Sequence, residues 1–224
     1  MKTKITLLIL IIIITIILYI FYPNNDIKTK EVVKEEKENI IKIRNHKYEI
    51  NIIYPITDYT LLNREIINIL DNYRKEFYNT LKYTTVNSYY TLYINYKGYT
   101  YQNYLSFIFY MEAYTGGAHP NHLITTINFD KSTNEIITID SLIKDNHNIL
   151  NTMSHLSRKS LSKIKIFNDP NIRSMMLEGT TPTKNNFKNI VFNSNGLLIL
   201  FERYQIAPYA YGQYSVIIPY YELK

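Results

Sequence analysis

An uninterrupted apolar run near the N-terminus constrains this 224-residue chain more than any other feature. The run extends from Ile5 to Tyr22, is relieved only by two threonines, and follows a short segment that contains Lys2 and Lys4. A helix of that length spans about 27 Å at ~1.5 Å per residue, which is close to the hydrocarbon thickness of a bilayer. The run therefore predicts one N-terminal transmembrane helix.

The flanks of the run indicate its orientation and its fate. Because the two lysines precede it, the positive-inside rule places residues 1–4 in the cytoplasm as a short stub and the rest of the chain outside. The run ends in aromatic residues and Pro23, without the small residues that suit signal cleavage, which favours an uncleaved signal anchor over residues 5–22. A cleaved signal peptide, which would release a secreted or periplasmic protein, is the alternative.

Charge and composition limit the classes of partner. Residues 23–39 mix acidic and basic side chains without apolar periodicity, which predicts a solvated tether of net charge −1 and leaves +5 for residues 40–224. The basic residues of that larger part are scattered, so we expect no nucleic-acid partner; anionic wall polymers and lipid headgroups are the polyanions met outside a membrane. The absence of Cys excludes disulfide scaffolds and a thiol-linked lipid anchor.

Residues 40–224 predict one α+β domain, with a mainly antiparallel sheet and two amphipathic helices. Helical spacing of apolar residues predicts the helices at 61–78, capped by Asp58 or Thr60, and at 149–164. Alternation or short apolar runs predict strands at 41–43, 48–54, 90–96, 105–111, 122–129, 135–139, 190–192, 197–202 and 214–220. Turns are expected at 97–100 and at Asn195-Gly196, and a loop at 167–186.

The most distinctive local string runs from Tyr114 to His122 and reads Tyr-Thr-Gly-Gly-Ala-His-Pro-Asn-His. Its paired glycines, Gly116 and Gly117, permit positive φ and the close approach of a backbone or a ligand. His119 and His122 are three residues apart, as metal ligands can be, but no third ligand accompanies them locally. We therefore expect no metal and no other cofactor, and we interpret the string as a structured turn, with ligand contact as the alternative.

Motifs of known enzyme classes are missing from the sequence. It contains no G-x-S-x-G, no H-E-x-x-H, no P-loop and no dinucleotide-binding fingerprint. The string Ser160-Leu-Ser-Lys163 fits S-x-x-K, but it lies on the second predicted helix without a matching partner motif. These observations favour a protein that is not an enzyme.

Five strings together resemble one extracytoplasmic module. They are Tyr114-Thr-Gly-Gly-Ala-His-Pro, Ile137-Thr-Ile-Asp-Ser-Leu-Ile, Asn186-Phe, and Phe201-Glu-Arg-Tyr-Gln-Ile-Ala-Pro-Tyr-Ala-Tyr-Gly followed by Val216-Ile-Ile-Pro-Tyr. The module is the domain of unknown function shared by RsiV-type lysozyme-sensing anti-sigma factors and PdaC-type peptidoglycan deacetylases, and the resemblance covers residues 40–224. It implies an ectodomain that acts by binding, since the deacetylases carry their catalysis in a separate domain.

The resemblance adds candidate residues near the C-terminus. Tyr204, Tyr209 and Gly212 have the pattern of a bend that joins the last two strands, and ligand binding is the alternative role. Four residues precede the apolar run and the chain ends soon after the module, so we expect neither a sigma-binding region nor a deacetylase domain.

The sequence thus predicts a membrane-anchored extracytoplasmic domain that binds a cell-wall polymer or another envelope component, or an envelope-directed protein such as lysozyme. A basic lysozyme would meet a domain of net charge +5 unfavourably unless an acidic patch is concentrated locally. The alternative is an accessory or catalytic protein of peptidoglycan modification, with His119 and His122 near the reactive centre.

Overall fold

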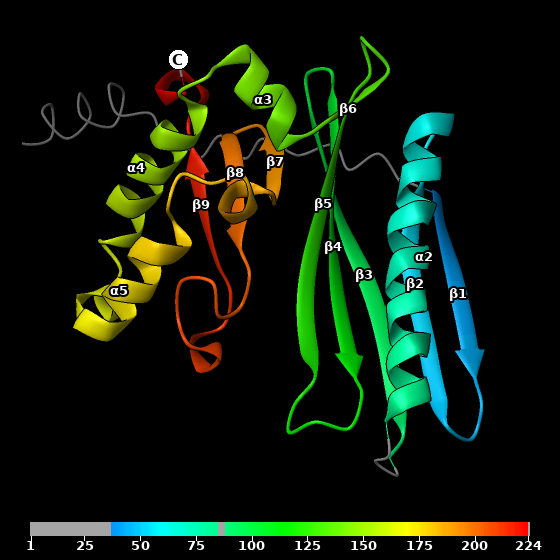
Figure 1. Cartoon of the computed structure of the whole chain (residues 1–224). Coiled ribbons are helices and arrows are strands. Elements are labelled where there is room, and N and C mark those ends of the chain that lie inside the picture. The colour runs from blue at the N-terminus through cyan, green and yellow to red at the C-terminus, as the bar shows by residue number, and fades with distance from the viewer. Residues whose placement is uncertain (1–36, 85–87, 224) are drawn as a thin grey trace, which may run out of the picture. The chain divides into compact units, whose positions relative to one another are not determined.

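The computed structural model of the chain describes residues 37–84 and 88–223 (Figure 1). The predicted stub, the predicted signal anchor at 5–22 and the tether up to residue 36 lie outside the described residues. Within the described ranges, no helix combines the length and the apolar character needed to cross a bilayer. The anchor and its orientation therefore stay predictions.

A six-stranded sheet contains the first six strands in their chain order. The strands are β1 (Lys37–Arg44), β2 (Tyr48–Ile56), β3 (Tyr90–Tyr101), β4 (Tyr104–Tyr114), β5 (Asn121–Asp130) and β6 (Glu135–Ile137). Neighbours are antiparallel except β2 and β3, which are parallel because helix α2 (Thr60–Tyr83) forms the crossover between them. The strands predicted for this half of the chain are confirmed, with shifted ends, and the apolar β4 lies inside the sheet as expected.

Two boundaries of the sheet differ from the prediction. A turn is expected at 97–100 because of Gly98, but β3 continues through these residues. The hairpin closes only after Tyr101, which pairs with Tyr104. Gln102 makes this closure possible, because its φ of 51° is the left-handed conformation that a two-residue hairpin turn requires. At the other end of the sheet β1 begins at residue 37, so the last residues of the expected tether belong to a strand.

Helix α2 covers one face of this sheet. Its buried side chains recur at helical spacing and comprise Leu62, Ile66, Leu70, Phe77 and Leu81. They pack against inward-facing residues of β2 to β5, among them Ile50, Ile52, Leu92, Ile94, Phe107, Phe109, Ile127 and Phe129. Neither Asp58 nor Thr60 caps the helix; instead the side chain of Asn63 accepts the N–H of Thr57 at 2.9 Å and donates to its carbonyl at 2.7 Å.

A second, three-stranded antiparallel sheet follows in the C-terminal part, with the order β7 (Ile190–Asn193), β8 (Gly196–Phe201) and β9 (Tyr214–Ile218). The hairpin predicted around Asn195-Gly196 and the edge position of the last strand are confirmed. Helices α3 (Ile139–Asp145), α4 (Ile149–Leu161) and α5 (Pro170–Gly179) enclose a second apolar core with this sheet.

The prediction of a loop at 167–186 is wrong, because this segment contains α5 and 3-10 turns at Lys165–Asn168 and Asn185–Phe187. The carboxylate of Asp169 accepts the N–H groups of Asn171 and Ile172 at 2.8 and 3.2 Å, and Pro170 occupies the first turn, so the start of α5 is fully specified. The described residues thus contain four α-helices rather than two. The α+β class with mainly antiparallel sheets is confirmed.

The second sheet covers part of the face of the six-stranded sheet that α2 leaves free. Ile108 and Ile124 of the large sheet pack there against Val191, Leu198 and Leu200. The edge strand β7 is also held by buried polar side chains: Asn128 Nδ2 donates to the carbonyl of Ile190 at 2.9 Å, and Ser106 Oγ accepts the N–H of Phe192 at 3.3 Å. These bonds satisfy backbone groups that an edge strand leaves unpaired.

Candidate ligand-binding site

The Gly-Gly-Ala-His string forms the connection between β4 and β5. Tyr114 ends β4 and pairs with Thr91 of β3, and Gly116 then turns the chain with a φ of 93°. Gly117 and His119 are exposed, and the Nδ1 atom of His119 lies 3.0 Å from the carbonyl oxygen of Pro120. The prediction of a structured turn is therefore consistent with the geometry of these residues.

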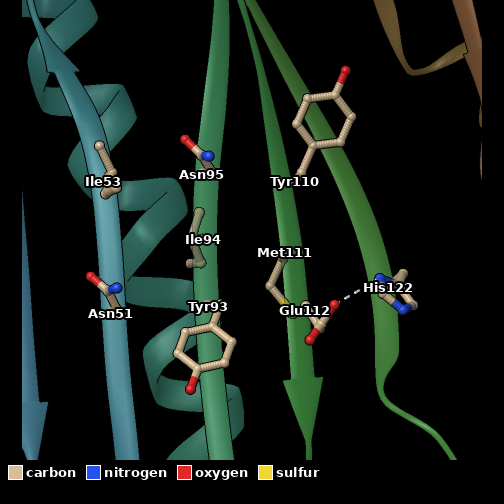
Figure 2. A pocket seen from close by; sticks show the side chains of 9 residues that line it. All are labelled: Asn51, Ile53, Tyr93, Ile94, Asn95, Tyr110, Met111, Glu112 and His122. Carbon is tan, nitrogen blue, oxygen red and sulfur yellow. Dashed lines mark ion pairs between the residues drawn. The ribbon is translucent and has the colours of Figure 1, made fainter.

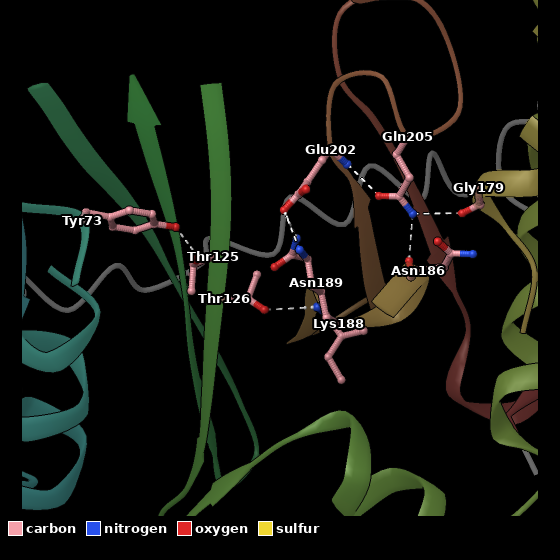
Figure 3. Close-up of polar contacts among 10 residues, drawn as sticks. Tyr73, Thr125, Thr126, Gly179, Asn186, Lys188, Asn189, Glu202 and Gln205 are labelled. Atoms are coloured by element: carbon pink, nitrogen blue, oxygen red, sulfur yellow. Dashed lines mark hydrogen bonds and ion pairs between the residues drawn. The ribbon is translucent and has the colours of Figure 1, made fainter. Parts of the chain in front are cut away.

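The string from Phe201 to Gly212 forms a bend between β8 and β9. The side chain of Gln205 holds the first residues of this bend (Figure 3). The Gln205 side chain donates from Nε2 to the carbonyls of Gly179 and Asn186, both at 2.9 Å, and its Oε1 accepts the N–H of Glu202 at 3.0 Å. Gly212 ends the bend with φ 77° and ψ −151°, a conformation that glycine alone adopts readily. Hydrogen bonds of Gln205 therefore hold the first end of the bend, and Gly212 provides the unusual backbone conformation at its other end.

Tyr209 brings the two strings together, although they are about ninety residues apart in the chain. Its ring stacks on His119 with the centroids 4.1 Å apart, and its hydroxyl donates to the carbonyl of Pro120 at 3.2 Å. The ring centroid of Tyr204 lies 5.4 Å from that of Tyr209, and the guanidinium carbon of Arg203 lies 4.4 Å from the Tyr209 centroid. We call Tyr209, His119, His122, Arg203 and Tyr204 the Tyr209 cluster.

His122 links the cluster to the six-stranded sheet. The ring centroids of His122 and Tyr209 are 6.1 Å apart. The Nδ1 atom of His122 lies 3.6 Å from a carboxylate oxygen of Glu112, the residue opposite it on β4. Burial lowers the pKa of His122 below its usual value, the positive charge of Arg203 lowers it further, and the carboxylate of Glu112 only partly opposes these effects. The imidazole is therefore uncharged at neutral pH.

A hollow lies on the sheet face beside the cluster, and His122 forms one side of it (Figure 2). Its volume is about 320 Å³. Helix α2 lies behind the sheet in this view, so the polar and aromatic side chains of the hollow occupy the opposite face. The residues that line it come from β2 to β5 and are Asn51, Ile53, Tyr93, Ile94, Asn95, Tyr110, Met111, Glu112 and His122.

The predicted site residues have different roles in the structure. The rings of His119 and Tyr204 both contact Tyr209, whereas Gly116 and Gly212 provide the positive-φ turns of the two segments that carry these rings. Tyr114 lies in the β3–β4 ladder.

A metal site would need a third ligand beside His119 and His122. In residues 37–84 and 88–223, no three His, Asp or Glu side chains gather closely enough to hold a metal ion.

The sequence motifs did not identify Arg203, Glu112 or the tyrosines of the hollow as site residues. Arg203 follows a strand end and carries no motif of its own. Tyr93 and Tyr110 occupy the outward positions of two predicted strands, where alternation places them away from the core. Their outward position on two strands of an expected hairpin is the signal that could have indicated them.

The fold and this site define an α+β module whose C-terminal part corresponds to a recognised domain. Residues 140–221 match the family model described as "Protein of unknown function (DUF3298)". This DUF3298 match contains α4, α5, the second sheet and the bend with Tyr209, while the turn with His119 lies before it.

One curated relative agrees with the resemblance to the PdaC-type module, and two solved structures share the fold. The chain is 28% identical over 114 residues to the peptidoglycan-N-acetylmuramic acid deacetylase PdaC of Bacillus subtilis (strain 168), a match that spans 51% of this chain and 24% of that protein. The crystal structure of a DUF3298 family protein from Pseudomonas aeruginosa PAO1 superposes with a TM-score of 0.58 at 15% identity and covers 84% of this chain and 92% of that one. A DUF3298 family member from Bacteroides fragilis NCTC 9343 gives 0.54 at 17% identity, with 84% and 91% covered.

Proposed function

We propose that this protein is a membrane-anchored extracytoplasmic binding module without catalytic activity, which recognises a cell-wall component or an envelope-directed protein. The observation that carries the proposal is that His122 belongs both to the Tyr209 cluster and to the open hollow on the sheet face. Two separate sequence strings thus converge on the rim of a cavity, which is the arrangement expected of a ligand site. The match to a peptidoglycan deacetylase supports a role at the cell envelope.

A pull-down tests this proposal. The full chain, purified in detergent because residues 5–22 are apolar, is incubated with purified cell-wall sacculi, with wall polymers and with lysozymes, at low and high salt. We expect retention on at least one of these, and retention on a basic lysozyme should strengthen as salt screens the domain's charge of +5. Retention on none of them would contradict a binding role.

A role in peptidoglycan modification is the second candidate, and one observation favours it. An uncharged imidazole beside a carboxylate, as in His122 with Glu112, can accept a proton from a substrate. Incubation of peptidoglycan with the protein and chromatography of the digested muropeptides tests this role. Altered products that are lost in His122→Gln would establish it, and an unchanged muropeptide profile would reject it.

A further inference from the structure

The hollow combines aromatic side chains with amide groups. Tyr93 and Tyr110 are 36% and 38% exposed as residues, although both lie on inner strands of the sheet. In Figure 2 these rings and the amides of Asn51 and Asn95 all lie on the sheet face away from α2. Flat apolar ring faces next to amide groups match a molecule that has both apolar C–H faces and hydroxyl groups.

We propose that the hollow is a subsite for a neutral glycan, in which the ring faces of Tyr93 and Tyr110 contact sugar C–H groups and the side chains around them bind sugar hydroxyls. This inference rests on the proposed binding function and specifies its ligand class.

One polar atom in the hollow lacks a partner. The Oδ1 atom of Asn51 is buried, and no hydrogen-bond donor reaches it from the described residues. A buried acceptor without a donor is unfavourable, and rotation of the Asn51 amide toward the hollow would bring this oxygen within reach of a ligand hydroxyl. Asn51 faces Tyr93 directly across the β2–β3 ladder, so a sugar placed on the Tyr93 ring would bring its hydroxyls near this atom.

The charge of the lining argues for a neutral ligand. Among the nine described residues that line the hollow, none is Lys or Arg, and Glu112 contributes a carboxylate. A phosphate-rich wall polymer or a lipid headgroup would meet this carboxylate directly, whereas the cations whose charge reaches the lining, Arg44, Lys97 and Arg203, lie outside it. A lining without a cationic side chain favours a neutral ligand over a polyanion.

The size of the hollow limits the ligand to a short stretch of glycan. Its volume of about 320 Å³ is at the lower end of the range of roughly 300–1,000 Å³ that small-molecule sites have. One or two sugar rings are thus the largest part that it can enclose, and the rest of a strand would continue over the exposed sheet face.

Isothermal titration of the full chain with the neutral tetramer of N-acetylglucosamine tests the inference, in a detergent without a sugar headgroup. We expect saturable binding that Tyr93→Ala weakens about tenfold and that Asn51→Ala weakens about fivefold. Tyr93→Phe keeps the ring and should bind almost as the unchanged chain does. Tyr221→Ala, which removes an exposed tyrosine outside the hollow, is the matched control and should not alter binding.

The outcomes separate this inference from the proposed function. If the tetramer does not bind, or binds all variants equally, while sacculi still retain the protein, the glycan subsite is wrong and the binding function stands. Competition by poly(glycerol phosphate) but not by the tetramer would likewise overturn it. If sacculi, polymers and lysozymes all fail to retain the protein, both proposals fall.

Discussion

The face of the six-stranded sheet opposite α2 is divided into two regions that the same strands build in different ways. In one region Ile108 and Ile124 are sealed beneath the second sheet, whose strand β7 is held by buried Ser106 and Asn128. In the other, residues of β3 and β4 only a few positions away face the hollow, among them Asn95, Tyr110 and Glu112. The sealed region has the composition of an interior, and the open region combines aromatic rings with polar groups.

The difference indicates that the sealed region contributes mainly to stability, whereas the open region is accessible to a ligand. A surface that contributed to folding alone would be apolar where it is covered and charged where it is not. The open region instead exposes aromatic rings next to a cavity and borders the Tyr209 cluster, as expected of a recognition surface. Substitutions in the two regions should therefore separate the free energy of unfolding from ligand affinity.

The largest expected contrast lies between neighbouring residues on opposite faces of β4. Phe109 is fully buried beneath α2, so Phe109→Ala should reduce the free energy of unfolding by about 3–5 kcal/mol. Tyr110 is partly exposed in the hollow, and Tyr110→Ala should cost no more than about 1 kcal/mol. Urea unfolding followed by circular dichroism measures both. Similar losses in the two variants would show that the open region is part of the folding core.

Two asparagines compare the sealed and the open regions of the same face. Asn128 is 2% exposed and donates to the carbonyl of Ile190, so Asn128→Ala should cost about 1–3 kcal/mol because that carbonyl is left unsatisfied. Asn95 is exposed in the hollow, and Asn95→Ala should change the stability by less than about 0.5 kcal/mol. The same urea titration measures the free energy of unfolding of both variants. A larger cost at Asn95 would contradict the division of the face.

Glycines in the two strings of the Tyr209 cluster should differ in the same way. Gly212 has a φ of 77°, so Gly212→Ala should cost about 1–2 kcal/mol and shift the bend that carries Tyr209. A Cβ on Gly117 would meet only the carbonyl of His119 at 3.7 Å, and Gly117→Ala should be tolerated. Proton NMR checks the bend, because His119 resonances should lose the ring-current shift of Tyr209 in the first variant and keep it in the second.

Elements with strong local patterns could be predicted from the sequence, and the misses have local physical causes. Alternation or short apolar runs indicated each of the described strands. Gly98 led to a turn four residues too early, because a glycine can equally remain in a strand and Gln102 can adopt the left-handed conformation instead. Helix α5 was missed in an Asn- and Thr-rich segment, although the pair Asp169-Pro170 is a helix-start signal.

The candidate site could be predicted only in its parts. Each string was recognisable by itself, yet the stacking of His119 on Tyr209 depends on how the second sheet packs against the first, which no local pattern encodes. The hollow likewise requires the parallel pairing of β2 with β3, which places Asn51 beside Tyr93. Tertiary contacts therefore had to be known before either arrangement could be inferred.

The smallest expected effect concerns the pH dependence of stability that His122, a residue of the open region, produces. Because the pKa of His122 is lowered in the folded state, the unfolded chain binds a proton more readily, and the free energy of unfolding should fall as the pH decreases from about 6.5, the ordinary histidine value, through the folded-state pKa. Arg203→Gln removes one cause of the lowering and should reduce this acid-induced loss, whereas Arg173→Gln, an exposed control, should leave it unchanged. Urea titrations between pH 7.5 and pH 5 measure the three slopes. Equal slopes in the two variants would mean that the charge of Arg203 does not act on His122.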